Sequence, residues 1–333
     1  MILAGDVGGT KTFLARFKAT GGLPGDPVAP EMLPSRSYPS FQALLHDYVS
    51  RHPGPTHAAC LGAAGAVVDG NVRVTSLPWV IESNALAEKL GLRRDRVSII
   101  NDLVATGYGL AALKPNELEP LQAGEPARDA SSGLIAAGTG LGETLLVREG
   151  RGMVPIPSEG GHADFAARTD EELRVFRVLR ARYGRVSWER VLSGPGLVAL
   201  GEFFHEERGT TSEWARHLEE VGVNGPAEIV SRRGMARDCP ACEQALRVFV
   251  GVYGAEAGNL ALRGVARAGI YLGGGIAPKI LPALKWEAFL QSFLDKDHLR
   301  PLLASIPVWV IRNELTGLLG AARYAATAEA REA

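Results

Sequence analysis

The sequence predicts an α/β protein with two domains. Its 333 residues exceed one typical domain, for which roughly 150 residues is a useful prior. Short apolar runs, such as residues 97–100, alternate with longer stretches of helical periodicity, a pattern typical of strands followed by helices. Residues 2–17 and 134–147 each place a glycine-rich turn between two strand patterns. These similar halves indicate a duplicated architecture.

The composition is that of an ordinary globular protein, with 46% hydrophobic and 22% charged residues. The 36 basic and 37 acidic side chains give a net charge of −1, so no global field attracts nucleic acid or an anionic membrane. No apolar run is long enough to span a bilayer, and the N-terminal residues carry no basic, cleavable leader. We therefore expect a cytoplasmic protein with neither a membrane nor a nucleic-acid partner.

Three cysteines are too few for a disulfide framework, which fits a reducing compartment. Cys239 and Cys242 form a CxxC pair that could serve redox chemistry or supply half of a zinc site. Because neither a second CxxC nor an HxxxH motif accompanies them, we interpret both as half-buried structural thiols. The histidines outside the motifs described below are interpreted as structural or solvated: His52, His57, His205, His217 and His298.

Proline and glycine mark the predicted loops. Residues 21–37 are predicted to form a surface loop and residues 114–132 a linker, with a domain boundary near Leu113. The predicted domains are 1–113 together with 312–333, and 114–311. Periodicity predicts helices at 41–49, 83–90, from Thr169 onward, 242–266 and 315–328, and strands within 58–74, 270–272 and 307–311.

Asn101 and Asp102 end an apolar strand pattern, and a helical pattern follows them at once. Open α/β sheets bind their ligands at the carboxyl ends of strands, where this pair would stand. A polar pair in this place is often only a helix cap, although one residue can serve as both cap and base. The glycine-rich turns elsewhere favour Asp102 as a general base for phosphoryl transfer to a sugar.

Two glycine-rich turns are candidate phosphate-binding loops, because glycines permit positive φ and let backbone N–H groups approach an anion. In the first turn Asp6 could hold a hydrated Mg²⁺ and the Thr10 hydroxyl could bond a phosphate, although a plain hairpin turn also needs glycines. After the second turn, at 138–142, a strand pattern resumes, whereas a dinucleotide-binding fold requires a helix there. This difference argues against a dehydrogenase.

Residues 157–165 form a loop dense in glycine and ionisable side chains, among them Glu159 and His162. Glu189 lies on a helical stretch beside Trp188. Carboxylate and imidazole groups can satisfy both the lone pairs and the protons of sugar hydroxyls. Taken singly, the two glutamates could be surface charges and His162 an ordinary loop histidine.

Together these motifs resemble the bacterial glucokinase family, within the actin/Hsp70/sugar-kinase superfamily and related to the ROK kinases. Six segments carry the resemblance in the family's order: GDVGGT at 5–10, IND at 100–102, GTGLG at 138–142, EGGH at 159–162, VSWERVLSGPGL at 186–197 and GGGIAP at 273–278. The paired cysteines, followed by GNLAL at 258–262, are similar to that family too. Lys11 and Ser76 depart from it, since many members carry Asn at both places. The ROK zinc-binding cysteine cluster is missing, so zinc is not expected.

The resemblance implies a two-domain, actin-like ATPase fold of the ribonuclease H type, with a cleft between the domains. It implies glucose as phosphoryl acceptor, ATP as donor, Mg²⁺ as cofactor, bound by Asp6, and a homodimer. Asp102 would take the proton of the glucose 6-hydroxyl, and the other sugar hydroxyls would be bound by Asn101, Glu159, His162 and Glu189. The residues implied to bind the nucleotide are Gly5, Asp6, Gly8, Gly9, Thr10, Lys11, Gly138, Thr139, Gly140, Gly142, Gly273, Gly274 and Gly275.

Three alternatives stay open at this point. Another hexose or N-acyl-hexosamine kinase would share the loop that carries Glu159 and His162. A sugar-responsive transcriptional regulator would need an N-terminal helix-turn-helix, for which we expect no room before Asp6. A phosphohydrolase of the same superfamily would use water as acceptor and would not need the Asn, Glu and His side chains that suit a sugar.

Overall fold

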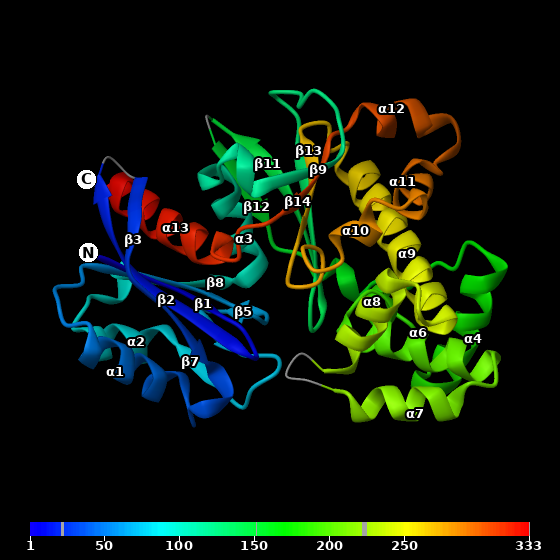
Figure 1. The fold of residues 1–333 in the computed structure, drawn as a ribbon. Coiled ribbons are helices and arrows are strands. Elements are labelled where there is room, and N and C mark those ends of the chain that lie inside the picture. The colour runs from blue at the N-terminus through cyan, green and yellow to red at the C-terminus, as the bar shows by residue number, and fades with distance from the viewer. Residues whose placement is uncertain (21–22, 151, 222–224, 333) are drawn as a thin grey trace. The chain divides into compact units, whose positions relative to one another are not determined.

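The chain folds into two compact units, each built on its own mixed sheet (Figure 1). The structure is a computed structural model that describes residues 1–20, 23–150, 152–221 and 225–332. One unit comprises Met1–Pro115, Gly152–Pro157 and Asn313–Ala333, and the other comprises Asn116–Arg151 and Ser158–Arg312. In the described part of the chain, none of the helices combines the length and the apolar character needed to cross a membrane.

The sheet of the first unit has the strand order β3-β2-β1-β4-β8. Its strands are β1 (Ile2–Val7), β2 (Lys11–Thr20), β3 (Leu23–Pro34), β4 (Ala58–Ala63) and β8 (Val97–Asn101). β1 pairs antiparallel with β2 and parallel with β4, and β4 pairs parallel with β8. In this register Val7 lies opposite Ala63 and Ala63 opposite Asn101, so the three parallel strands end together at one edge.

Helices cover both faces of this sheet, because the strands are apolar on both sides. Leu3 and Val7 of β1 point to one face and pack with α1 (Phe41–Arg51) and α2 (Ser83–Leu90). Ile2 and Ala4 point to the other face and pack with α3 (Asp102–Gly109) and α13 (Thr316–Glu332). Figure 1 shows α1 and α2 on one side of these strands and α13 on the other. By alternation, Asp6 points to the α3 and α13 face.

The second unit is built on a sheet whose strands follow the order β11-β10-β13-β14-β9. These strands are β9 (Leu118–Gln122), β10 (Ser132–Ala137), β11 (Leu141–Glu149), β13 (Gly269–Gly273) and β14 (Val308–Ile311). The strand β12 (Gly152–Ile156) belongs to the segment Gly152–Pro157 of the first unit. The long helix α9 (Pro240–Gly264) is buried along most of its length in the core of this unit. The other helices are α4 (Asp170–Tyr183), α5 (Trp188–Val191), α6 (Gly194–Glu207), α7 (Thr211–Glu219), α8 (Pro226–Ala236), α10 (Leu281–Leu284), α11 (Glu287–Leu294) and α12 (Arg300–Ser305).

The two sheets repeat one topology, as the paired glycine-rich turns predicted. Each begins with an antiparallel hairpin, β1/β2 or β10/β11, whose first strand pairs in parallel with a later strand, β4 or β13. A second parallel strand, β8 or β14, follows in each sheet. The prediction that a strand resumes after residues 138–142 is therefore confirmed.

Two predicted loops are wrong, since residues 23–34 form β3 and residues 118–122 form β9. Residues 21 and 22 of the first predicted loop lie outside the described residues. Both segments contain prolines, which lack an N–H and suggested a break in structure. However, β3 and β9 are the terminal strands of their sheets, where a missing ladder donor is tolerated, and register shifts interrupt both pairings.

Polar residues and glycines occupy several turns and helix starts. Asp69 and Gly70 have φ of 52° and 74° between β5 (Val67–Val68) and β6 (Asn71–Arg73), and β6 also pairs with β7 (Val80–Glu82). The Thr169 side chain accepts a hydrogen bond from the Glu172 N–H at the start of α4. Ser83 is the first helical residue of α2, and the N-cap residue Glu82 makes no side-chain capping bond.

Candidate active site

Asn101 and Asp102 stand where β8 ends and α3 begins. The Asn101 Oδ1 atom accepts hydrogen bonds from the N–H groups of Leu103 at 2.9 Å and Val104 at 3.3 Å, so Asn101 is the helix cap. Its amide nitrogen donates to the Gly65 carbonyl at 3.2 Å. Asp102 is the first residue of α3, where the helix dipole favours a negative side chain. The Asp102 Oδ1 atom also accepts from the Leu103 N–H, at 2.9 Å, so both residues bond to the first turn of α3.

Asp6 lies beside Asp102 at the same edge of the first sheet. Asp6 pairs with Gly62 on β4, and a Cβ atom added to Gly62 would lie 3.6 Å from the Asp102 Cα atom. Burial raises the pKa of Asp6 from 3.8 to about 7, and the negative charge of Asp102 adds to the rise. The start of α13 is equally close, because a Cβ added to Gly317 would lie 2.6 Å from the Asp6 Oδ2 atom.

This pair of carboxylates fits a hard divalent cation. Two like charges at one sheet edge repel each other, and burial makes the ionised form of Asp6 costly. A cation would offset both penalties, and carboxylate oxygens with water are the ligands that Mg²⁺ prefers. Asp6 is therefore suited to the metal role expected from the sequence.

The first glycine-rich loop is held in place by hydrogen bonds from neighbouring segments. The Gly8 N–H donates to the Lys11 carbonyl at 3.0 Å and closes the turn. The Ser35 hydroxyl donates to the Gly8 carbonyl at 2.8 Å, and the Ser35 N–H donates to the Thr10 carbonyl at 3.0 Å. Thr10 and Lys11 are exposed at the tip, and Gly5 lies within β1. A rigid loop with exposed polar groups is suited to bind phosphate.

The second glycine-rich loop is tied to the segment that carries Glu189. The Leu141 N–H donates to the Glu189 Oε2 atom at 3.0 Å, and the Gly194 N–H donates to the Gly138 carbonyl at 2.8 Å. A Cβ added to Gly140 would lie 2.4 Å from Glu189 Oε2, so a larger residue there would require the Glu189 carboxylate to move. Thr139 is exposed at the tip, and Gly142 lies in β11 opposite Ala136.

The positive φ expected of these glycines is absent from most of them. Among the described glycines of both loops, none has a positive φ: Gly5, Gly8, Gly9, Gly138, Gly140 and Gly142. The space beside two of them is limited, since a Cβ added to Gly9 would lie 2.5 Å from the Ser76 Cβ atom and one added to Gly140 would lie 2.4 Å from Glu189 Oε2. Gly274 alone of the third run, Gly273 to Gly275, has a positive φ, of 78°. The third run follows β13, and the Ile276 N–H donates to the Ala137 carbonyl, next to the second loop.

Glu159, His162 and Glu189 come together in the second unit. The Glu159 Oε2 atom lies 3.9 Å from His162 Nε2, and the Glu189 Oε1 atom lies 3.9 Å from His162 Nδ1. Their side chains are 65%, 57% and 32% exposed in the order Glu159, His162 and Glu189, so a ligand can reach all three. Glu189 sits on the short helix α5, which the buried side chain of Trp188 anchors in the core.

The loop that carries Glu159 and His162 is fixed from both sides. Its short 3-10 helix (Gly160–His162) packs against β11, and a Cβ added to Gly161 would lie 2.0 Å from the Leu141 carbonyl oxygen. The Arg185 guanidinium donates to the His162 carbonyl and to the Asp164 carboxylate, each at 2.8 Å. The glycine pair and the arginine hold His162 in a defined position.

One charged cluster near this loop was missed by the sequence analysis. Glu143 of β11 is buried, and its Oε2 atom accepts from Arg263 at 3.1 Å. Burial, with the nearby charge of Glu256, raises the pKa of Glu143 to about 8. A Cβ added to Gly160 would lie 2.6 Å from Glu143 Oε2, so the carboxyl group lies directly beneath the loop. A glutamate within an otherwise apolar strand was the signal that could have revealed it.

The comparisons with known proteins agree over nearly the whole chain. The family model described as Glucokinase matches residues 3–328. A glucokinase from Nostoc punctiforme is 36% identical over 340 residues, covering 98% of this chain and 99% of the relative. Among solved structures, a glucokinase from an Antarctic psychrotroph has a TM-score of 0.80 at 28% identity and covers 97% of this chain and 98% of that one.

A more distant structure has the same fold. It is a ROK family glucokinase from Streptomyces griseus in complex with glucose and AMPPNP, with a TM-score of 0.66 at 19% identity, covering 97% of this chain and 98% of that one. At this identity the likeness concerns the fold alone. Since the family model spans almost every residue and the Nostoc relative matches end to end, the chain belongs to the glucokinase family.

Proposed function

We propose that this protein is an ATP-dependent glucokinase that converts glucose to glucose 6-phosphate and releases ADP. The main observation is the position of Asp102 at the end of β8 beside the half-buried Asp6, in a chain of the glucokinase family. The relatives at 34–37% identity over nearly the full chain are named glucokinases, which favours this activity over a phosphohydrolase or a regulator. The named relatives are all glucokinases.

Asp102 would act as the general base. Phosphoryl transfer is achieved mainly by positioning and charge neutralisation, and the acceptor hydroxyl must lose its proton as the new P–O bond forms. A carboxylate within hydrogen-bond reach can orient that hydroxyl and accept its proton. Asn101 provides the capping bonds of α3, and the Asp102 Oδ1 atom accepts a further hydrogen bond from the Leu103 N–H at 2.9 Å. An ionised carboxylate has about four lone-pair sites, so this bond orients the Asp102 carboxylate without using up its capacity to accept a proton.

Glu159, His162 and Glu189 would bind the remaining sugar hydroxyls. Their exposed fractions and mutual distances suit a small polar ligand that replaces water. Asn101 would contribute through its amide nitrogen, because its amide oxygen caps α3. A site built on such hydrogen bonds rejects an analogue that lacks one hydroxyl, since a buried polar group would be left unpaired.

The two glycine-rich loops would bind the phosphates of ATP, with the run Gly273 to Gly275 against the adenosine. The exposed Thr10, Lys11 and Thr139 offer hydroxyl and ammonium groups in addition to backbone N–H donors. Asp6 would hold Mg²⁺, which neutralises phosphate charge when it is bound. The Streptomyces griseus relative, solved with glucose and the ATP analogue AMPPNP, is consistent with this pair of substrates.

We further propose that residues 1–113 with 312–333 act as the small domain and residues 114–311 as the large domain of a homodimeric enzyme. In this division Asp6, Asn101 and Asp102 belong to the small domain, and the Glu159, His162 and Glu189 cluster belongs to the large domain. Light scattering coupled to size-exclusion chromatography tests the dimer, since a monomer at working concentration contradicts it.

Substrate discrimination tests the proposed activity. ADP release from Mg·ATP should be measured without sugar and with glucose, mannose, fructose or N-acetylglucosamine, with the product identified by mass spectrometry. We expect the highest kcat/KM for glucose and almost no release without sugar. Preference for another sugar would establish a different hexose or hexosamine kinase, and sugar-independent release would establish a phosphohydrolase.

A further inference from the structure

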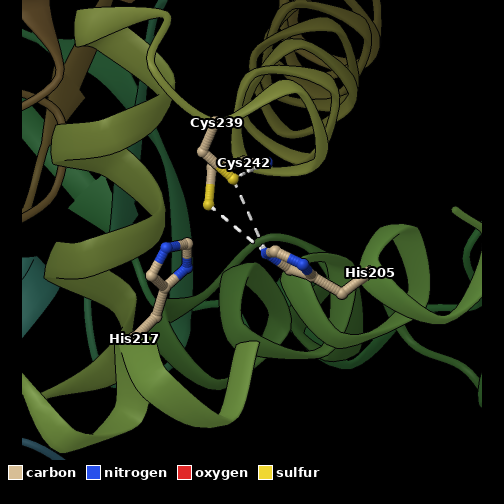
Figure 2. A group of neighbouring side chains, drawn as sticks. All are labelled: His205, His217, Cys239 and Cys242. Atoms are coloured by element: carbon tan, nitrogen blue, oxygen red, sulfur yellow. Dashed lines mark hydrogen bonds between the residues drawn. The ribbon is translucent and has the colours of Figure 1, made fainter. Parts of the chain in front are cut away.

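Four sulfur- and nitrogen-bearing side chains from three helices meet in the interior of the second unit (Figure 2). His205 lies near the end of α6, His217 lies on α7, and Cys239 and Cys242 lie at the start of α9. The exposed fraction is 4% for His217 and 0% for the other three residues. One ligand atom from each side chain lies within 4.8 Å of the other three.

The distances within this cluster fit tetrahedral metal coordination. The His205 Nε2 atom lies 3.6 Å from Cys239 Sγ and 3.7 Å from Cys242 Sγ. In a tetrahedral zinc site, with Zn–S of about 2.3 Å and Zn–N of about 2.05 Å, the edge between sulfur and nitrogen measures about 3.6 Å. The distances from His205 Nε2 to the two sulfur atoms therefore match those of a tetrahedral zinc site.

His205 is held with the correct nitrogen facing the sulfur atoms. Its Nδ1 atom lies 3.1 Å from the Thr210 carbonyl oxygen and 2.9 Å from the Thr210 hydroxyl. Because a carbonyl can only accept, Nδ1 carries the hydrogen in that bond and Nε2 keeps its lone pair. Metal-ligating histidines characteristically donate their other N–H to a backbone carbonyl in this way.

His217 supplies the independent sign of a missing ligand. Its Nε2 atom lies 3.6 Å from the Glu213 carboxylate, whereas its Nδ1 atom is buried and has no hydrogen-bond partner. A buried polar atom without a partner is rare in proteins and requires an explanation. A metal ion accounts for it, since Nδ1 would donate its lone pair to the ion.

The two cysteines are arranged as metal ligands and poorly as a redox pair. Cys239 is the N-cap of α9, and its Sγ atom accepts a hydrogen bond from the Cys242 N–H at 3.2 Å. This bond places the Cys239 sulfur atom at the N-terminus of α9, beside the Cys242 backbone. A redox dithiol must be accessible, whereas both sulfur atoms are inaccessible to solvent here.

We propose that His205 Nε2, His217 Nδ1, Cys239 Sγ and Cys242 Sγ bind one structural Zn²⁺ ion. Two imidazoles and two thiolates are a donor set that zinc prefers, and four protein ligands leave no open position for chemistry. Binding releases the two thiol protons to solvent. The ion links α6, α7 and α9, and it replaces the earlier interpretation of these residues as structural thiols and structural or solvated histidines. The site does not depend on the proposed kinase activity.

The metal content of the intact protein tests this proposal directly. Protein from cells grown with added zinc and purified without chelator should contain about one zinc ion per chain by plasma mass spectrometry. Cys242→Ser and His217→Gln should lose most of that zinc. Cys60→Ala removes another buried thiol and His298→Gln removes a histidine outside the cluster, so both should keep it.

Wild-type protein alone also decides the question if the variants fail to fold. Metal-free protein loaded with Co²⁺ should show the intense near-ultraviolet thiolate-to-metal bands and the visible bands of a tetrahedral site, and removing the metal should lower the melting temperature. Wild-type protein that contains no zinc and whose melting temperature is unchanged by added Zn²⁺ overturns the proposal. The proposal is also overturned if unfolded protein, prepared without reductant, contains only one free thiol of the three, because Cys239 and Cys242 would then form a disulfide.

Discussion

Asp6 offers a quantitative test, because its carboxyl group ionises only at a cost in the folded protein. Burial, with the charge of Asp102, raises its pKa from 3.8 to about 7. The unfolded chain releases this proton near about pH 4, whereas the folded chain keeps it until about pH 7. Between these values the folded state binds more protons than the unfolded state, so the free energy of unfolding falls as pH rises. Above about pH 7 the penalty is complete.

The pKa shift sets the size of the effect. A rise of about three pKa units corresponds to a ceiling of about 4 kcal/mol. Asp6 keeps part of its surface exposed, and solvent screening reduces this ceiling, so we expect a penalty of about 2 kcal/mol. Asp6→Asn removes the charge at nearly constant shape. In the absence of metal, the free energy of unfolding of the variant should therefore exceed that of wild type by about 2 kcal/mol at about pH 8. At about pH 5 the difference should be distinctly smaller.

Urea denaturation followed by circular dichroism measures this gain, in buffer without Mg²⁺ or nucleotide. Asp26→Asn is the matched control, because Asp26 is exposed and its replacement should change nothing at either pH. An Asp6→Asn variant that is no more stable than wild type at the higher pH would refute the reasoning. The same Asp6→Asn variant should lose Mg·ATP-dependent turnover, because the substitution removes the charge that would bind the metal while it stabilises the fold.

Substitutions at four further positions separate the roles of the site residues. Gly161→Ala should raise the KM for glucose about tenfold or more by displacing the loop from the Leu141 carbonyl; an unchanged KM would contradict this. Asn101→Ala should lower the free energy of unfolding by about 1 kcal/mol because the helix cap is lost, whereas Asn101→Asp should keep the cap and the stability. Equal melting temperatures of the two variants would contradict the capping role. Glu189→Ala should weaken both glucose and nucleotide binding, because it also removes the acceptor of the Leu141 N–H in the second glycine-rich loop. Glu159→Ala should weaken glucose binding only. Equal losses of glucose and nucleotide affinity in both variants, measured by calorimetry, would contradict this distinction.

The fold around Asp102 could be predicted from sequence because its signals are local. A β-branched strand that ends abruptly in two polar residues specifies a strand, a cap and a helix within a few positions. The glycine-rich hairpins were predictable for the same reason. The edge strands β3 and β9 were not, because their prolines signal a loop, and only their terminal place in a sheet makes those prolines tolerable.

The site was predicted less completely than the fold, because its geometry depends on contacts between distant segments. Glu189 was chosen from its motif, but its hydrogen bond from the Leu141 N–H could be seen only in the structure. The Cys₂His₂ cluster was missed because its ligands come from three helices. No local spacing connects His205 and His217 with the CxxC pair until those helices pack together.

Glucose-dependent ADP release by wild type and Asp102→Asn tests the central claim most directly. The substitution keeps the shape of the side chain and removes only its ability to accept a proton. We predict that turnover falls by about 10²–10⁴-fold, in line with the loss of a general base, while the dissociation constant of glucose stays within about tenfold. Turnover near the wild-type rate would contradict the assignment of Asp102 as the base.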